Sequence, residues 1–314
     1  MEKTCYHVPI MVEETLSLLR PERGGTFVDG TLGGGGHARA VLEKLPKGSR
    51  LIGIDRDAEA LAAANVRLAD FGESFTAVHG NFHDMADILG RLGIAKADGI
   101  LLDLGVSSHQ LDSAERGFSY RQDAALDMRM DRSGGITAAE VVNSCSEAEL
   151  ARIFFEYGEE RFSRRIAARI CERRVQQPFS ATVELAGFIA GCIPAKFKEP
   201  GQHPARRCFQ GLRIEVNDEL APLEKLLRKA HSLLSDGGRL VVLTFHSLED
   251  RIVKQTFANF AKPCTCDPRA PICSCGLEPM GRILSRKPLI AGAGEREENS
   301  RSQCAKLRGF EKQT

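Results

Sequence analysis

A cluster of glycines follows a short apolar run near the start of this chain, and these residue types suit the binding of a nucleotide. Residues 26–28 have the composition of a buried strand, which ends at Asp29 and leads into a turn with glycines at positions 33–36. A helical stretch follows from about residue 37 to residue 45. Strand, glycine turn and helix form the βα unit that binds nucleotides, because glycine permits positive φ and a close approach of the ligand.

The acid at the start of this turn limits the kind of nucleotide that fits. The carboxylate of Asp29 would repel a pyrophosphate. The turn lacks the Gly-Lys-Ser/Thr ending of a phosphate-binding loop and matches the dinucleotide pattern GxGxxG poorly. S-adenosylmethionine carries a sulfonium and an ammonium but no phosphate, so the sequence favours this cofactor over a nicotinamide dinucleotide. A glycine-rich turn in an unrelated α/β protein is the alternative.

Two further expected strands end in an acid. Residues 50–54 lead to Asp55, which is placed to accept hydrogen bonds from ribose hydroxyls, and residues 98–102 lead to Asp103. Phe82 follows the intervening strand, where its ring could stack on an adenine or simply belong to the core. Because ligands of open α/β sheets bind at the carboxyl ends of the strands, these residues together predict a cofactor site there.

The order of the expected elements predicts an α/β, Rossmann-like core that is interrupted by an all-helical lobe. Strands and helices alternate up to about residue 104, then the strand pattern disappears and returns only after about residue 213. We therefore predict a discontinuous core of residues 1–105 and 214–314 and an inserted lobe of residues 106–213, which could hold RNA.

Periodicity predicts the positions of several elements after the fourth strand. An amphipathic helix is expected over residues 219–234 and a buried strand over residues 239–245. In the lobe, helices are expected over residues 138–142, 147–157, 162–174 and 182–190.

The composition excludes some classes of protein. The apolar fraction of 42% is ordinary for a globular chain of 314 residues. The sequence has no run of about 18 apolar residues, and its N-terminus lacks the basic and apolar regions of a secretory signal, so we expect a cytoplasmic protein. The net charge of +1 excludes a bulk polycation, so any contact with RNA must come from local basic patches.

Basic residues gather in three places that could form such patches. Arg161, Arg165 and Arg169 recur every four positions in a stretch of helical character, so they are expected on one helix face. A solvated face balanced by nearby glutamates is the alternative. Several separate clusters favour RNA, because phosphates are their natural partner. The other clusters are Lys196, Lys198, His203, Arg206, Arg207 and Arg213, and, in the tail, Arg282, Arg286, Lys287, Arg301, Lys306 and Arg308.

Over almost its whole length, the chain resembles the ribosomal RNA small-subunit methyltransferase H family, also called MraW. The resemblance implies a class I S-adenosylmethionine-dependent methyltransferase that modifies N4 of a cytidine in the decoding centre of 16S ribosomal RNA. The matching segments, highly specific together, are HVPIMVEETLSLL (7–19), VDGTLGGGGH (28–37), IGIDRD (52–57), LLDLGVSSHQLD (101–112), ERGFSY (115–120), LDMRMD (126–131), FQGLRIEVNDEL (209–220) and TFHSLEDR (244–251).

The resemblance also implies site residues and partners. The family pattern has proline in one position where this chain has His109. The implied partner is 16S ribosomal RNA or the 30S subunit, with no role for DNA or a membrane. A non-enzymatic module that binds S-adenosylmethionine or RNA in ribosome assembly is the alternative function. The implied cofactor contacts are Gly35, Gly36, His37, Asp55, Phe82, Asp103 and Gln110.

Methyl transfer to cytosine N4 needs help from the protein, because the N4 lone pair is delocalised into the ring. Alignment of N4 with the methyl group lowers part of the barrier to transfer. An acceptor for an N4 proton would also localise the lone pair on N4 as the new bond forms. Asp103 is the first candidate acceptor, although the cofactor could occupy it. His246 is the second, although it could be a structural histidine. Glu215 and Asn217 are further candidates for contacts with the base or the cofactor.

Cysteine is used in two ways in this chain. Six of the ten cysteines are scattered, which suits a reducing compartment. The other four, Cys264, Cys266, Cys273 and Cys275, form two C-x-C pairs on either side of a proline-containing loop. Four thiolates can bind zinc tetrahedrally, although the usual spacing is C-x₂₋₄-C. A reduced surface loop and a redox-labile cluster are the alternatives.

Overall fold

The computed structural model describes residues 9–267 and 274–313, and the chain divides into two compact units. Residues up to 105 and from 220 onward form the core unit, and residues 106–219 form the lobe. The second boundary lies at residue 219, whereas the sequence predicts residue 213. The reason is α10 (Arg206–Asn217), an unbroken helix of the lobe that continues past residue 213 and ends at Asp218, where the backbone turns left-handed (φ 48°).

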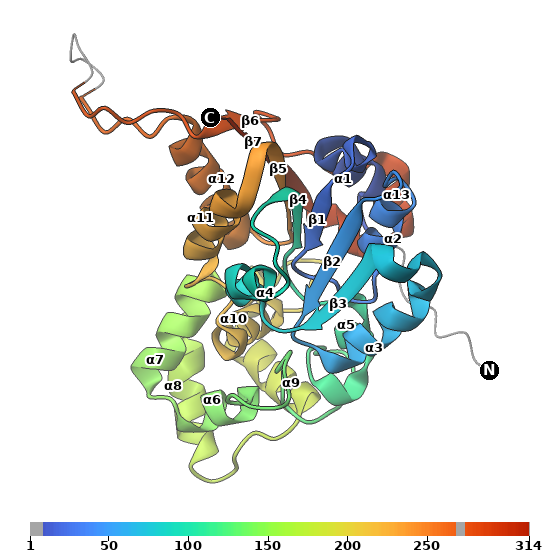
Figure 1. Cartoon of the computed structure of the whole chain (residues 1–314). Helices are drawn as coiled ribbons and strands as arrows, with labels where there is room; N and C mark the ends of the chain where they lie inside the picture. Colours follow the sequence, from blue (N-terminus) through green and yellow to red (C-terminus); the bar gives the residue numbers. More distant parts are fainter. Residues whose placement is uncertain (1–8, 268–273, 314) are drawn as a thin grey trace. The chain divides into compact units, whose positions relative to one another are not determined.

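The core unit contains a seven-stranded sheet with the order β3-β2-β1-β4-β5-β7-β6. Strands β1 to β5 pair in parallel, whereas β7 runs antiparallel to its two neighbours. The strand order reverses between β1 and β4, which lie side by side (Figure 1), and this confirms the predicted Rossmann-like α/β fold. The strands are β1 (Thr26–Asp29), β2 (Arg50–Asp55), β3 (Phe75–His79), β4 (Ala97–Asp103), β5 (Leu234–Thr244), β6 (Gly281–Ile283) and β7 (Lys306–Lys312).

Helices cover both faces of this sheet. Successive residues of a strand point to opposite faces, so Phe27 and Val28 belong to two different hydrophobic clusters. Phe27 shares its cluster with residues of α1, α2 and α3, and Val28 shares its own with residues of α4, α11 and α12. Burial on both faces explains why residues 100–102 of β4 and 240–243 of β5 are continuously apolar. The helices are α1 (Val12–Leu19), α2 (Gly36–Leu42), α3 (Ala58–Arg67), α4 (Met85–Arg91), α11 (Leu223–Leu233), α12 (Ser247–Ala261) and α13 (Ala293–Glu298).

The lobe packs around a hydrophobic core of its own, which includes Leu150, Phe154, Ile166 and Leu212. The four predicted lobe helices are confirmed, with ends that differ by one or two residues except where α7 passes into a π-helical turn. The sequence does not predict α10. The helices are α5 (Ser108–Asp112), α6 (Ala138–Ser144), α7 (Glu147–Arg152), the π-helix η5 (Ile153–Tyr157), α8 (Ser163–Arg174), α9 (Thr182–Cys192) and α10.

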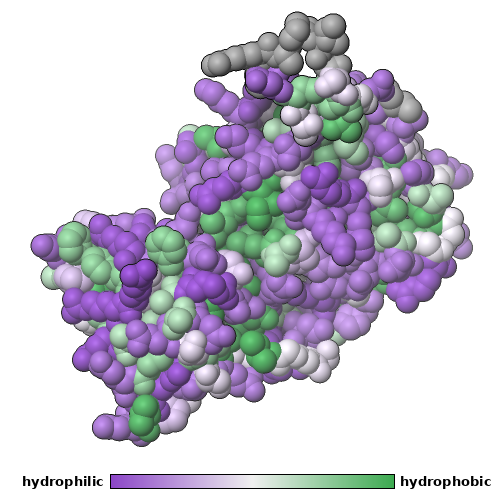
Figure 2. Space-filling model, turned by 90° about the vertical axis from the view of Figure 1, so that its left-hand side faces the viewer, coloured by the Kyte–Doolittle hydropathy of each residue, from purple (hydrophilic) through white to green (hydrophobic). Residues whose placement is uncertain are grey.

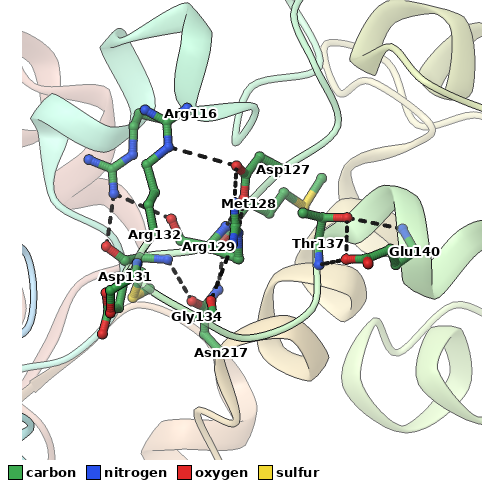
Figure 3. A network of polar contacts seen from close by, with 12 residues as sticks. Arg116, Asp127, Met128, Arg129, Asp131, Arg132, Gly134, Thr137, Glu140 and Asn217 are labelled. Atoms are coloured by element: carbon green, nitrogen blue, oxygen red, sulfur yellow. Dashed lines mark hydrogen bonds and ion pairs between the residues drawn. The ribbon is translucent and has the colours of Figure 1, made fainter.

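Polar contacts hold the long segment that precedes α6 in the lobe (Figure 3). The side chain of Arg116 is buried, with 1% of its surface exposed, and its Nη2 donates to the carbonyl of Met130 at 2.9 Å. Asp127 accepts two hydrogen bonds from the guanidinium of Arg129, at 2.7 and 3.0 Å. Asn217 at the end of α10 accepts one from the Met130 N–H at 2.8 Å. Each buried charge in this network therefore has a polar partner.

The C-terminal part of the core unit differs most from the sequence-based expectation. The helix predicted to begin at residue 219 begins at Leu223, and the strand predicted to begin at residue 239 begins at Leu234. The sequence does not predict β6 or β7, which extend the sheet beyond β5. Among the residues that the structure describes, no helix has the length and apolar character needed to cross a bilayer.

Candidate active site

The glycine turn between β1 and α2 is packed closely against the core unit's own side chains. Gly33 and Gly35 adopt left-handed conformations, with φ of 50° and 75°. A Cβ atom on Gly35 would lie 3.0 Å from Leu68 Cδ1, and one on Gly36 would lie 3.1 Å from Pro9 Cβ. The positive φ at Gly33 and Gly35 and the crowding at Gly35 and Gly36 show that the fold itself favours glycine here, in addition to the access to a ligand that the sequence predicts.

Two acids from neighbouring strand ends are linked through the turn. Asp29 ends β1, and Asp103 ends β4. The Thr31 N–H donates to Asp29 Oδ1 at 3.1 Å, and the Asp103 N–H donates to Thr31 Oγ1 at 2.6 Å. Thr31 thus joins both strand ends, a role that sequence reasoning missed, although a threonine directly after an Asp-Gly turn was a usable signal.

The buried imidazole of His37 faces this pair of acids. Its Nε2 lies 2.9 Å from the Ile10 carbonyl, so Nε2 carries a hydrogen. Its Nδ1 lies 3.3 Å from Asp103 Oδ2. Because the carboxylate oxygen can only accept, this contact is favourable only when Nδ1 also carries a hydrogen. The two partners therefore favour the doubly protonated, cationic ring.

Burial sets the electrostatics of this cluster. Asp29 is 2% exposed, and its burial raises the pKa of the carboxyl from 3.8 to about 7, although the charge of His37 opposes the shift. Burial works against the charged form of His37. The hydrogen bond and charge of Asp103, the charge of Asp29 and the contact with the Ile10 carbonyl together outweigh it, so the pKa of His37 is raised. The Asp103 side chain is 29% exposed and is the member that a ligand can reach. Once Asp29 ionises, the cluster has two carboxylates around one imidazolium and suits a ligand of positive charge.

Asp55, the predicted ribose contact at the end of β2, supports the glycine turn. Its Oδ2 accepts a hydrogen bond from the Gly33 N–H at 2.7 Å, and its Oδ1 accepts one from the Asp57 N–H at 2.9 Å. Burial raises the pKa of Asp55, against these two hydrogen bonds. Each carboxylate oxygen can accept a second hydrogen bond, so the ribose contact stays a prediction.

Phe82 lies beside the glycine turn. It begins the short helix η3 (Phe82–Asp84), is partly buried, and packs against the hydrophobic cluster of α4, α11 and α12. A Cβ on Gly30 would lie 3.4 Å from Phe82 Cβ. Both of its predicted roles, as an adenine platform and as a core residue, are compatible with this position.

Gln110 belongs to the lobe rather than to the core unit that contains the other predicted cofactor residues. It is 5% exposed, and its Oε1 accepts a hydrogen bond from the Ser107 N–H at 3.1 Å. Within the lobe, Gln110 therefore stabilises the first turn of α5. Its contact with the cofactor stays a prediction.

His246 follows the end of β5 and caps α12. Because Asp103 of β4 is paired with Leu243 of β5, these two strand ends are neighbours. The imidazole Nδ1 of His246 accepts from the Glu249 N–H at 3.4 Å, and its Nε2 lies 3.0 Å from Glu249 Oε1 without the alignment of a hydrogen bond. With Nδ1 used as an acceptor, Nε2 carries the hydrogen. This geometry favours the structural alternative and leaves Asp103 as the better candidate acceptor.

Glu215 and Asn217, the other candidates for base or cofactor contacts, have structural tasks in the lobe. Glu215 forms an ion pair with Arg152 at 3.0 Å. Asn217 Nδ2 donates to the Met128 carbonyl at 2.8 Å. Both contacts tie α10 to the rest of the lobe.

The predicted arginine face of the lobe is shorter than expected. Arg161 lies before α8, whose N-cap is Phe162, so it does not share a helix face with Arg165 and Arg169. Its guanidinium instead lies over the ring of Phe197, 4.4 Å from the centroid. Arg169 forms an exposed ion pair with Glu172.

Arg161 and Phe197 line an open pocket in the lobe. Lys198, His203 and Arg206 from the second predicted basic cluster also line it. Phe197 is 38% exposed. The face of the molecule in Figure 2 is mostly hydrophilic, with hydrophobic side chains in separate patches. Cationic groups beside an exposed aromatic ring suit a single-stranded nucleic acid. The aromatic part was missed, although basic residues flank Phe197 in the sequence.

Three of the six residues in the basic cluster of the tail form ion pairs within the core unit. Arg308 donates to Asp250 at 2.7 Å and is 7% exposed. Lys306 also pairs with Asp250, at 3.1 Å, and Arg282 pairs with Glu311 at 2.7 Å. Tail residues 306 and 308 therefore stabilise β7 more directly than they serve an RNA surface.

Comparisons with known proteins place this chain among methyltransferases. A sequence model of the MraW methylase family matches residues 4–313. The chain is 52% identical over 307 residues to the ribosomal RNA small subunit methyltransferase H of Symbiobacterium thermophilum, covering 98% of this chain and 96% of the relative. It is 54% identical to the protein of the same name in Geobacter sulfurreducens, covering 98% and 99%. A solved rRNA methylase from Streptococcus thermophilus aligns with a TM-score of 0.40 at 13% identity, covering 97% and 96%.

Proposed function

The chain belongs to the MraW methylase family, and we propose that it transfers a methyl group to N4 of a cytidine in the decoding centre of 16S ribosomal RNA. The observation that carries the proposal is the cluster of Asp29, His37 and Asp103 at two adjacent strand ends. Relatives that share half of its sequence are named as methyltransferases of the ribosomal small subunit.

The methyl donor is S-adenosylmethionine, as the sequence predicts, and the residues at the strand ends fit it. Its sulfonium supplies an already activated methyl group. Carboxyl groups of Asp29 and Asp103 favour its positive charges, Asp55 is placed to accept from the ribose, and Phe82 offers a ring beside the glycine turn. Gly35 and Gly36, which carry no side chains, would let the cofactor approach the backbone of the turn closely.

In this proposal Asp103 accepts a proton from N4 as the carbon–nitrogen bond forms. Its Oδ2 faces His37, and its backbone N–H is fixed by Thr31, so the carboxylate is oriented before the substrate binds. The second carboxylate oxygen takes no part in these contacts. Loss of the proton localises the N4 lone pair, which makes the amine a better nucleophile.

The lobe provides the RNA-binding surface in this proposal. Arg161 and Arg206 would contact phosphates, and Phe197 would stack on an unpaired base. Because its substrate is ribosomal RNA, either bare or assembled in the 30S subunit, we place the reaction in the cytoplasm.

The test is to incubate the protein and labelled S-adenosylmethionine with 30S subunits and with bare 16S RNA, both from cells that lack the modification. Nucleoside mass spectrometry should detect N4-methylated cytidine in at least one of them, and Asp103→Asn should greatly reduce it. Binding of the cofactor and RNA without any methylated product would favour the non-enzymatic alternative. A product methylated on another base or atom would refute the N4 assignment alone.

A further inference from the structure

An arm of the core unit lies between α12 and β6 (Figure 1). The structure describes residues 262–267 and 274–280 of it, and each of these is half-buried or exposed. At the base of the arm, the Met280 N–H donates to the Phe260 carbonyl at 2.8 Å. Leu277 is 48% exposed. The described arm thus contributes no apolar core of its own, and an ordered arm needs another source of stability.

Three thiols from both sides of the arm converge. Cys264, Cys266 and Cys275 place their sulfur atoms within 4.8 Å of one another, and the sulfurs of Cys264 and Cys275 are 3.6 Å apart. A disulfide needs about 2.05 Å. Four thiolates at about 2.3 Å from a tetrahedral zinc ion are about 3.8 Å apart, which agrees with the shortest observed separation. Cys273, the fourth predicted ligand, lies outside the described residues.

We propose that Cys264, Cys266 and Cys275 bind a thiolate-preferring divalent cation, Zn²⁺, which fastens the two sides of the arm together. Three converging sulfurs exceed what one disulfide would require. Borderline-soft ions such as Zn²⁺ are bound by thiolates, whereas Mg²⁺ and Ca²⁺ prefer oxygen. The site lies apart from the strand-end cluster and takes no part in the proposed transfer.

Backbone groups of the arm support the same arrangement. The Ser274 N–H donates to Cys266 Sγ at 3.3 Å. Such hydrogen bonds stabilise a thiolate and orient metal ligands.

The test measures metal in the full chain, purified under reducing conditions and dialysed after exposure to Zn²⁺. Inductively coupled plasma mass spectrometry should find one zinc ion per protein molecule. Replacement of Zn²⁺ by Co²⁺ should give the near-ultraviolet charge-transfer band of cobalt–thiolate bonds. Cys264→Ser, Cys266→Ser and Cys275→Ser should each weaken Zn²⁺ binding by more than the roughly 10- to 100-fold that loss of an outer hydrogen-bond partner costs. Cys304→Ser, which alters an exposed thiol outside the arm, should keep full zinc content.

The variants should stay folded, because the described arm residues bury little surface. Circular dichroism and cofactor titration check this directly, so loss of zinc can be separated from loss of structure. The proposal is overturned if the folded, reduced protein contains no zinc, or if the three variants keep it. A disulfide between Cys264 and Cys275 in peptide maps of the unreduced protein, without metal, would also overturn it.

Discussion

Buried carboxyl groups have opposite pKa shifts in the strand-end cluster of the core unit and in the polar network of the lobe. In the lobe, Asp127 meets two nitrogens of Arg129, and the pKa of Asp127 is lowered because these hydrogen bonds outweigh its burial. In the core unit, Asp29 is more deeply buried, and its pKa is raised to about 7 because burial outweighs the nearby charge of His37.

The contrast separates a structural network from a binding site. A carboxylate that a guanidinium fully satisfies has little to gain from a ligand. Carboxyl groups that share one imidazole carry an electrostatic cost that a cation can relieve, and perturbed groups of this kind gather at functional sites. The following predictions test this distinction, beginning with the largest expected effect.

Asp103→Asn should lower turnover by about 10²-fold or more, because the amide keeps the shape of the side chain but cannot accept the N4 proton. Affinity for RNA should change little, since a proton acceptor acts mainly in the transition state. Single-turnover rates and RNA titration measure the two effects. Weaker cofactor binding at an unchanged rate would instead assign Asp103 to the methionine part of the cofactor. His246→Ala is the matched comparison and should remain within a few-fold in turnover if the cap role is its only one.

Asp55→Ala should weaken S-adenosylmethionine binding by about 1.5–3 kcal/mol, the range for hydrogen bonds to a charged group. Isothermal titration calorimetry measures this change in binding free energy. Asp55 also holds the Gly33 N–H, so the free energy of unfolding must be measured beside it. A loss of stability with unchanged cofactor affinity would show that Asp55 has only a structural role, as Asp127 has in the lobe.

Arg116→Met should destabilise the lobe by about 1–3 kcal/mol, because it leaves buried carbonyl groups such as that of Met130 without their donor. Methionine preserves much of the volume. Urea unfolding measures the change, and Arg121→Met, at an exposed position, should stay within about 0.5 kcal/mol. Equal stabilities of the two variants would mean that the network is not structural.

The two clusters should respond to pH in different ranges. Because the pKa of Asp29 is raised in the folded protein, the free energy of unfolding should fall as the pH rises from about 4 to about 7. The pKa of Asp127 is lowered, so its contribution to stability is present above about pH 4 and is lost as the pH falls below that value. Cofactor affinity should rise as the pH passes through about 7, because the ionised carboxylate attracts a cation. Deprotonation of His37 acts in the same direction.

Calorimetry from pH 6 to pH 8.5 tests this, and Asp29→Asn should flatten the rise to the part that His37 contributes. An unchanged profile in Asp29→Asn would show that Asp29 does not set the electrostatics of the site.

The strand-end residues were predictable because the parallel strands place every carboxyl end on one edge, so local patterns suffice to locate Asp29, Asp55 and Asp103. The partners of those residues were not predictable in the same way. Asp55 binds the Gly33 N–H across 22 residues, and β7 pairs with β5 across more than 60, so neither contact has a local signature. Periodicity also placed Arg161 in a helix that begins two residues later, because a four-residue spacing does not reveal where a helix starts.

The smallest expected effect concerns the lobe pocket and extends the comparison to arginines. Arg173 forms an ion pair with Glu184, whereas Arg161 lies over Phe197 at the pocket. Arg161→Ala should leave cofactor affinity unchanged and reduce the salt slope of RNA binding by about one unit, the loss expected for one phosphate contact. Binding measured over a range of salt concentrations gives the slope. Arg228→Ala, which removes an exposed arginine from the core unit, is the control and should keep the parent slope. If both variants retain it, the guanidinium of Arg161 serves only to pack the lobe, and its pocket is not the RNA surface.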